Sequence, residues 1–254
     1  MMNILFTVCG RAGSKGIKNK NIREFLGYPL PYYTFAAIAQ YIEEYATDHI
    51  DVAVNTDSSE LIKMAEENPF IDLSVIDRKA ELAEDRIPKT AVILDTFLQM
   101  KEKTRRHYVM VVDLDLTSPL RTAKDIDALV EKQKKVNADV TFSVTGSRRN
   151  PYFNMVIESE KGVKKVLNSD FVARQQAPAV YDMNASLYAY NPAFLQTGKG
   201  VLDGYCEIIQ MYDTGILDLD HENDFELMQV IAKYLFENKD EFSTAFAFMK
   251  RKLT

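Results

Sequence analysis

Apolar positions along the chain follow two periods in turn, and this predicts strands alternating with helices. Residues 3–8 form a short apolar run typical of a strand. Over residues 31–45 the apolar positions recur at helical spacing, and residues 50–54 then alternate as in a strand. Because strand, helix and strand in succession are the rhythm of α/β proteins, we expect a mostly parallel central sheet with helices on both faces.

The same rhythm continues further along the chain. We expect strands over residues 71–76, 108–112 and 138–144, and helices that start near Ser58, Thr90 and Thr122. All five residues of 108–112 are apolar, so this strand should be central and buried on both faces.

Residues 147–185 interrupt the pattern. Two short β-like runs flank Lys161-Gly162, which indicates an inserted hairpin. We therefore expect a single domain over residues 1–254 with a small β-rich arm at about 147–185.

Composition narrows the class of function. The 254 residues carry a net charge of −6, which argues against a nucleic-acid-binding or membrane-surface protein. The two cysteines, Cys9 and Cys206, lie far apart, and neither they nor the three histidines have the spacing of a zinc site. With no signal peptide or long apolar run in the sequence, we expect a cytoplasmic protein, with Cys9 as a buried packing residue.

The loop after the first predicted strand concentrates glycines and cations. Its glycines are Gly10, Gly13 and Gly16, and its cations are Arg11, Lys15, Lys18 and Lys20. Glycines allow tight turns that point backbone N–H groups at an anion, so the loop suits phosphate binding. The spacing is neither that of a Walker loop nor that of a dinucleotide turn, and a solvated basic loop is the alternative.

Arg11-x-x-Ser14-Lys15-Gly16 followed by Lys20-Asn21 resembles the signature of the sialic-acid-type cytidylyltransferases, the CMP-acylneuraminate synthetase family. The resemblance implies that Arg11, Ser14 and Lys20 contact the triphosphate of CTP, that Asn21 contacts the nucleotide, and that Lys15 adds to the same nucleotide site. Arg11 and Lys20 are the expected catalytic cations.

Two further stretches bear on the nucleotide. Asp57 follows the strand over residues 50–54, where capping of the next helix is one interpretation and a place at the nucleotide pocket, as in the family, is the other. Arg78-Lys79-Ala80-Glu81-Leu82-Ala83-Glu84-Asp85 resembles the family's Arg-Pro-x-x-Leu-Ala-x-Asp. The resemblance implies that Arg78 contacts the ribose or base.

Asp115 stands just beyond the central strand, in Asp113-Leu114-Asp115-Leu116-Thr117-Ser118-Pro119-Leu120-Arg121. This resembles the family's Leu-Gln-Pro-Thr-Ser-Pro-Leu-Arg, with Asp115 where glutamine is usual. Ligands of open α/β sheets gather at this edge, so we expect Asp115 to bind the sugar and influence its choice. Capping of the following turn is the alternative.

The arm carries a further pair of candidates. Arg174 and Asn184 match the arginine and asparagine of the family's Arg-x-x-x-Pro…Asn-Gly-Ala-Ile-Tyr, with Ala185 in place of the glycine. The resemblance implies that both lie near the sugar acid and that the arm forms a homodimer. Without the resemblance, Arg174 would be an ordinary surface arginine.

Asp218 and Asp220 alternate along a predicted strand, residues 216–220, and so share one face. Two acids side by side are tolerated when solvated, or when a divalent cation lies between them and a phosphate. They match the family's metal-binding Asp-x-Asp, which implies a Mg²⁺ site.

The implied reaction is attack by a nonulosonic, sialic-acid-like sugar on CTP, giving a CMP-sugar and pyrophosphate. The departures at residues 9–11, 113–115, 149–154 and 181–186 resemble the branch that activates legionaminic acid, with N-acetylneuraminic acid as the alternative. A non-catalytic nucleotide-binding protein is the alternative from another class. No general base stands out, and a metal-bound hydroxide and a neighbouring carboxylate both remain open.

Overall fold

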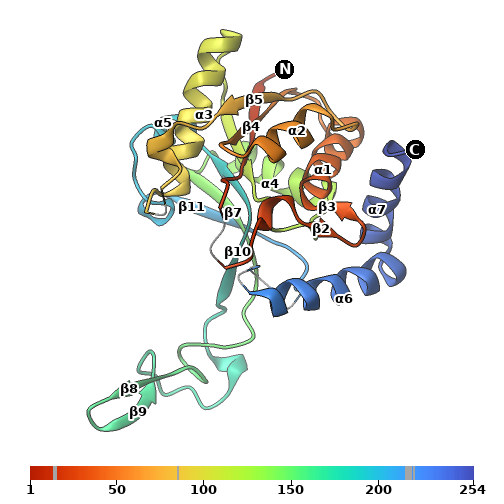
Figure 1. Cartoon of the computed structure of the whole chain (residues 1–254). Coiled ribbons are helices and arrows are strands. Elements are labelled where there is room, and N and C mark those ends of the chain that lie inside the picture. Colours follow the sequence, from red (N-terminus) through yellow and green to blue (C-terminus); the bar gives the residue numbers. More distant parts are fainter. Residues whose placement is uncertain (14–15, 85, 215–218, 220) are drawn as a thin grey trace.

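The computed structural model describes residues 1–13, 16–84, 86–214, 219 and 221–254, and it is built around a seven-stranded sheet (Figure 1). The strands follow the spatial order β11-β7-β10-β6-β1-β4-β5. Their bounds are β1 Asn3–Cys9, β4 His49–Thr56, β5 Ser74–Asp77, β6 Met110–Leu114, β7 Val140–Gly146, β10 Tyr181–Tyr190 and β11 Cys206–Gln210. Neighbouring strands are parallel except that β10 is antiparallel to β6 and β7, which confirms the mostly parallel sheet.

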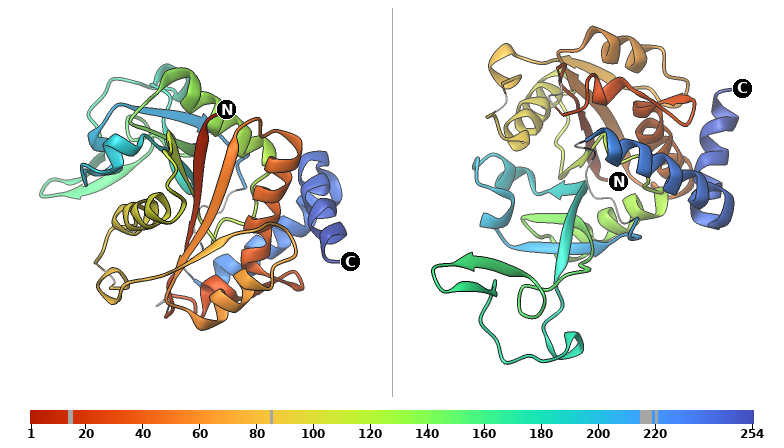
Figure 2. Two further views of the ribbon diagram at one scale, coloured as in Figure 1. Left: turned by 90° about the horizontal axis from the view of Figure 1, so that it is seen from above. Right: turned by 60° about the horizontal axis from the view of Figure 1, so that its bottom comes forward.

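Helices cover both faces of this sheet, as predicted. They are α1 Leu30–Glu44, α2 Ser59–Glu66, α3 Lys89–Thr104, α4 Ala123–Val136, α5 Pro192–Leu195, α6 Glu222–Asn238 and α7 Asp240–Lys252. In the left view of Figure 2, α3 (yellow) lies on one side of the sheet, and α1 (orange) and the C-terminal helices (blue) lie on the other. The predicted cap of α4 is present, because Thr122 accepts from the backbone N–H of Asp125 and its own N–H donates to the Asp125 carboxylate.

The alternation of β1 explains how two cores form on one sheet. Ile4, Phe6 and Val8 point into the core shared with α1 and α4, whereas Leu5 and Cys9 point into the core formed with α3. The buried Cys9 is therefore a packing residue, as predicted.

Three buried polar side chains interrupt the α3 core at one end of neighbouring parallel strands. Thr7 of β1, Asn55 of β4 and Asp113 of β6 are all fully buried. They occupy the alternate strand positions whose side chains point toward α3, and they lie at the carboxyl ends of their strands. The α3 core thus opens into a polar site at the edge where open α/β sheets bind ligands.

Some predicted boundaries were wrong. The strand expected over residues 71–76 is β5, Ser74–Asp77, because residues 71–73 make no pairs with β4. The central strand is shifted to Met110–Leu114, and Val109 is exposed.

The predicted hairpin is present and projects from the rest of the chain (Figure 1). Its strands are β8 Val156–Ser159 and β9 Gly162–Lys165, which pair antiparallel. The predicted end of the arm at residue 185 was wrong, because Tyr181–Tyr190 is β10 of the main sheet. From here on, "the arm" means residues 147–180.

Short elements complete the chain. They are the strands β2 Glu24–Phe25 and β3 Tyr28–Pro29, and the 3-10 turns η1 Lys20–Ile22, η2 Ala80–Leu82, η3 Arg174–Gln176 and η4 Val201–Asp203. The turns η1 and η2 matter most for the site, since both border the polar edge described below.

Candidate active site

The glycine-rich loop leaves β1 at Gly10, where a Cβ atom would force buried neighbours to shift. A Cβ atom on Gly10 would lie 2.5 Å from Leu116 Cδ1 and 2.8 Å from Leu61 Cδ2, and both of these leucines are buried. Gly13 adopts a φ of 70°, which glycine reaches without strain. The sequence therefore allows the loop to run close against the core before it turns outward.

Asp57 holds this loop in place. Its Oδ1 accepts a hydrogen bond of 2.8 Å from the backbone N–H of Ala12. The helix cap that Asp57 could have supplied comes instead from Ser58, whose hydroxyl accepts from the N–H of Leu61. The capping interpretation of Asp57 was therefore wrong, and its role is to tether the loop.

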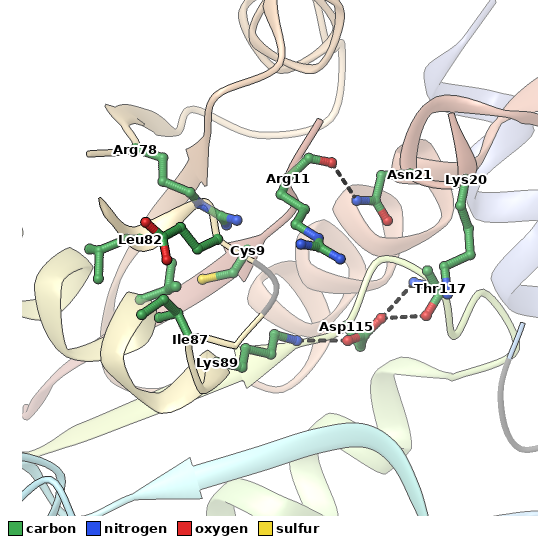
Figure 3. Close-up of a pocket in the computed structure, with 12 residues that line it drawn as sticks. Cys9, Arg11, Lys20, Asn21, Arg78, Leu82, Ile87, Lys89, Asp115 and Thr117 are labelled. Carbon is green, nitrogen blue, oxygen red and sulfur yellow. Dashed lines mark hydrogen bonds and ion pairs between the residues drawn. The ribbon is translucent and has the colours of Figure 1, made fainter. Parts of the chain in front are cut away.

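A cavity of about 290 Å³ opens at the same edge of the sheet (Figure 3). It brings together side chains from the loop, η1, η2, α3 and the turn after β6. Its lining residues are Cys9, Arg11, Lys20, Asn21, Arg78, Leu82, Glu84, Ile87, Lys89, Val92, Asp115 and Thr117. Five of the residues predicted from sequence thus meet in one cavity, namely Arg11, Lys20, Asn21, Arg78 and Asp115.

One side of the cavity is cationic, and the other combines apolar side chains with Arg78. Figure 3 shows Arg11 and Lys20 beside Asn21, with Leu82 and Ile87 at the opposite end. Asn21 fixes the cationic side, because its Nδ2 donates to the carbonyl oxygen of Arg11 at 3.0 Å. The apolar side suits a flat ring, and the cationic side suits anions.

Arg78 is held rigidly at the apolar end. Its Nε donates to Asn55 Oδ1 and its Nη2 to the Asn55 carbonyl oxygen, each at 2.9 Å. Burial lowers the pKa of the Arg78 guanidinium from its ordinary value. The rest of its fork is available to a ligand only in the orientation that Asn55 dictates.

Asp115 shows both properties considered from the sequence, since it lines the cavity and also caps its turn. Oδ1 accepts from the backbone N–H of Thr117 at 2.8 Å and from the Thr117 hydroxyl at 2.6 Å. Oδ2 accepts from Lys89 Nζ at 2.7 Å. The turn cap is therefore real, and a contact with the sugar stays a prediction.

Lys89 is a site residue that sequence reasoning missed. It is the first residue of α3 and lies within 2.8 Å of Asp113 Oδ2 as well as 2.7 Å of Asp115 Oδ2. A cation in the first turn opposes the helix dipole, and this mismatch was the available sequence signal.

Arg121 was also missed as a positioning residue. It is buried, and its guanidinium donates to the carbonyl oxygens of Asp115, Ser118 and Ser186. These bonds join the turn after β6 to β10, so Arg121 fixes the turn that carries Asp115 and Thr117.

Of the three predicted sugar contacts, Asn184 and Arg174 lie outside this cavity. Asn184 is buried and lines a smaller hollow that also includes Ser118 and Pro119, on the turn after β6. Arg174 lies exposed on the arm, in η3, where it donates to the Ser147 carbonyl oxygen. A single chain therefore brings Asn184 near the turn but does not bring Arg174 to the cavity.

Four predicted site residues lie outside the described part of the chain: Ser14, Lys15, Asp218 and Asp220. Within the described ranges, no cluster of three or more His, Cys, Asp or Glu residues could hold a metal ion. The helices in those ranges also include none that is long and apolar enough to cross a membrane.

Comparison with other sequences gives consistent results. A family described as Cytidylyltransferase matches residues 5–241. Post-translational flagellin modification protein B of Campylobacter coli is 33% identical over 233 residues, which are 92% of this chain and 96% of that protein. CMP-N,N'-diacetyllegionaminic acid synthase of Campylobacter jejuni is 33% identical over 231 residues, 91% of this chain and 95% of that protein. An N-acylneuraminate cytidylyltransferase of Streptococcus agalactiae is 26% identical over 237 residues, 93% of this chain and 54% of that protein.

Solved structures share the fold at low sequence identity. A CMP:2-keto-3-deoxy-manno-octonic acid synthetase complexed with CTP superposes with a TM-score of 0.63 at 12% identity, covering 91% of this chain and 98% of that chain. A 4-diphosphocytidyl-2C-methyl-D-erythritol synthase from Anaerococcus prevotii gives a TM-score of 0.61 at 12% identity, covering 91% and 99%.

Proposed function

This chain belongs to the cytidylyltransferase family and is a nucleotidyltransferase, and on that premise we propose that it activates a nonulosonic acid with CTP. The sugar's anomeric hydroxyl oxygen would attack the α-phosphorus, and the bond from that phosphorus to the bridging oxygen of the β-phosphate would break. The products are a CMP-sugar, pyrophosphate and a proton. The observation that carries the proposal is the single cavity in which Arg11, Lys20, Asn21 and Arg78 meet at the carboxyl edge of the sheet.

The two sides of the cavity suggest how CTP would lie. The triphosphate would bind Arg11 and Lys20, and the cytosine ring would lie toward Leu82 and Ile87 near Arg78. Phosphoryl-type transfer needs positioning and charge neutralisation above all, and a rigid cationic loop supplies both. The tethers from Asp57 and Asn21 hold the loop in this form before the nucleotide arrives.

Magnesium is part of the same proposal. The donor set fits the ion, because Asp218 and Asp220 offer the carboxylate oxygens that Mg²⁺ prefers. When bound, Mg²⁺ would neutralise phosphate charge and polarise the α-phosphate.

We propose legionaminic acid, in its diacetylated form, as the sugar. The support is the 33% identity, over nearly full length, to the Campylobacter jejuni protein named CMP-N,N'-diacetyllegionaminic acid synthase. The alternative is N-acetylneuraminic acid, because the relative named N-acylneuraminate cytidylyltransferase is 26% identical.

The sugar assignment is tested through Asp115, whose side chain keeps 23% of its surface exposed. A carboxylate only accepts hydrogen bonds, whereas glutamine also donates. We expect Asp115→Gln to lower kcat/KM for legionaminic acid relative to N-acetylneuraminic acid by about tenfold to a hundredfold, as for one mispaired buried polar group. Parallel kcat/KM measurements with both sugars check this, and an unchanged ratio would leave Asp115 as the turn cap and the partner of Lys89, with no part in sugar choice.

We also propose that the working form is a homodimer joined through the arm. Exposed apolar side chains gather on this projecting segment, and they are Met155, Val156, Ile157, Val163, Leu167 and Val172. Apolar surface of this kind on a projecting hairpin suits an interface with a second copy of the chain. Such a contact could also carry Arg174 toward the partner's sugar site.

A further inference from the structure

The ammonium of Lys89 lies between two carboxylates at the carboxyl end of the central strand, β6. Asp113 is the fourth residue of β6, and Asp115 follows the strand directly. Lys89 Nζ is 2.8 Å from Asp113 Oδ2 and 2.7 Å from Asp115 Oδ2. Residues two apart on a strand share a face, so a single cation can reach both.

The remaining oxygens of this pair are already occupied. Asp113 Oδ1 accepts from the Thr7 hydroxyl at 2.9 Å, and Asp115 Oδ1 accepts from Thr117. Asp113 is completely buried. Two carboxylates this close repel each other unless a cation lies between them, and in many proteins that cation is a hard divalent metal. Here the chain supplies the cation itself.

Lys89 also faces the cavity. Its side chain keeps 34% of its surface exposed and is part of the cavity wall beside Arg11 and Asp115 (Figure 3). An ammonium has three N–H donors; one donates to Asp115 Oδ2, and the contact with Asp113 Oδ2 is an ion pair. The exposed side of the group therefore has a donor to offer to a ligand in the cavity.

We propose that Lys89 is a nucleotide-binding residue that occupies the place of a metal ion between Asp113 and Asp115 and donates an N–H on its exposed side to the phosphates of CTP. The identity of the ligand as CTP rests on the proposed function. The claim that Lys89 takes the place of a metal ion between the two carboxylates does not depend on that function. It has two consequences. The Asp113-Asp115 pair binds no divalent cation in the native protein, and Lys89 adds to the charge that Arg11 and Lys20 present.

The charge state agrees with this geometry. Burial pulls the pKa of Lys89 down, but the attraction of Asp113 and Asp115 outweighs burial and holds the pKa well above its ordinary value. Lys89 is therefore a permanent cation at every pH at which the enzyme would work.

The first test measures KM for each substrate separately in Lys89→Met, which keeps the length of the alkyl chain and removes the charge. We expect KM for CTP to rise about tenfold to a hundredfold, the range for one lost charged hydrogen bond, with KM for the sugar nearly unchanged. Lys79→Met is the matched control. The Lys79 ammonium pairs with Asp95 of α3 at 2.5 Å, and Lys79 lies outside the cavity lining. An unchanged KM for CTP, or an equal rise for both substrates, would overturn the proposal.

Loss of Lys89 leaves Asp113 as a buried charge without its cation, which could prevent folding. The double variant Lys89→Met/Asp113→Asn removes that charge and leaves Asp115 in place. We expect it to fold and still to show the selective rise in KM for CTP. A folded double variant with native KM for CTP would contradict the phosphate contact.

The second test needs neither CTP nor sugar. Lys89→Ala opens the space between the two carboxylates, so titration with Mn²⁺ alone should detect one more bound ion per chain than in the native protein. The same number of ions in both proteins would overturn the metal-replacing role. If the native enzyme failed to use CTP while this extra ion appeared, the proposed function would fail and the role of Lys89 between the carboxylates would stand.

Discussion

Ala185 adopts a backbone conformation that suits glycine better. Its φ is 53°, in the middle of β10, where the pairing with β7 shifts register between Met183 and Tyr188. Next to this irregularity, the Ser186 carbonyl oxygen accepts hydrogen bonds from the backbone N–H of Asp115 and from Arg121. The sheet thus accepts local strain in order to hold the turn of the candidate site.

We expect Ala185→Gly to raise the free energy of unfolding by about 0.5–1 kcal/mol, because glycine relieves the left-handed strain and loses only part of that gain to chain entropy. Urea denaturation measures this change. Ala189→Gly is the matched control, since Ala189 lies in the same strand, is buried and has no positive φ. It should lower stability, and a loss of stability in Ala185→Gly as well would refute the strain argument.

Individual site residues were predictable where the sequence carries a local motif. Arg11, Lys20 and Asn21 stand within one short loop, and the structure places them together in the cavity. Lys89 and Asp57 act through partners 26 and 45 residues away along the chain. The local sequence could single out these two positions, but it could not identify their partners.

At the scale of the element, β4 is anchored at its start by one carboxylate, far along the strand from the candidate site. Asp51 accepts two hydrogen bonds from Arg106 Nη1, at 2.7 and 2.8 Å, and one from the Tyr108 hydroxyl at 2.7 Å. Burial raises the pKa of Asp51, but these donors outweigh burial and leave the pKa below its usual range. A carboxyl with a lowered pKa stabilises the fold above its unfolded-state pKa, and this stabilisation is lost as pH falls through the folded-state pKa.

We therefore expect Asp51→Asn to lower the free energy of unfolding by about 1–2 kcal/mol near neutral pH. The expected loss is modest because Arg106 is partly exposed, and solvent weakens its ion pair with Asp51. The difference from the native protein should shrink below about pH 4, where Asp51 becomes protonated in the unfolded chain. Urea denaturation at several pH values measures both effects, with the exposed Asp72→Asn as the control. A difference that stays constant down to about pH 3 would contradict the linkage to Asp51.

Elements with strong periodicity were predicted well, and those defined by distant pairing were not. The predictions near α1, α4 and β1 rest on clear apolar patterns and agree with the structure. The edge strand β11 was missed, because most of its five residues are only half-buried and give a weak pattern. The insertion of β10 between β6 and β7 depends on pairs such as Leu187 with Leu114, which no local pattern encodes.

For the molecule as a whole, the arm is the part most open to an interface. Val156 and Val163 lie on one face of the β8-β9 hairpin, since Val156 and Glu158 share a face and Glu158 pairs with Val163. Their exposed fractions are 62% and 68%.

We expect Val156→Asp/Val163→Asp to raise the dissociation constant of the dimer at least about a hundredfold, because two apolar side chains would be replaced by charges in the interface. Analytical ultracentrifugation over a range of concentrations measures this. The control is Lys164→Asp, which changes the charge on the other face of the hairpin. A native protein that is monomeric at all concentrations tested would refute the dimer.

The central claim is the transfer of CMP from CTP to a nonulosonic acid, and the most direct measurement is pyrophosphate release by the native enzyme. With CTP, Mg²⁺ and N,N'-diacetyllegionaminic acid together, we predict pyrophosphate and a CMP-sugar in equal amounts, with neither formed when the sugar or the metal is left out. Asp218→Ala and Asp220→Ala should lose nearly all turnover while remaining folded, as expected for several kcal/mol of lost metal-based stabilisation. Binding of CTP without pyrophosphate release for any nonulosonic acid, or equal turnover with ATP, would contradict the claim and favour a nucleotide-binding protein without catalysis.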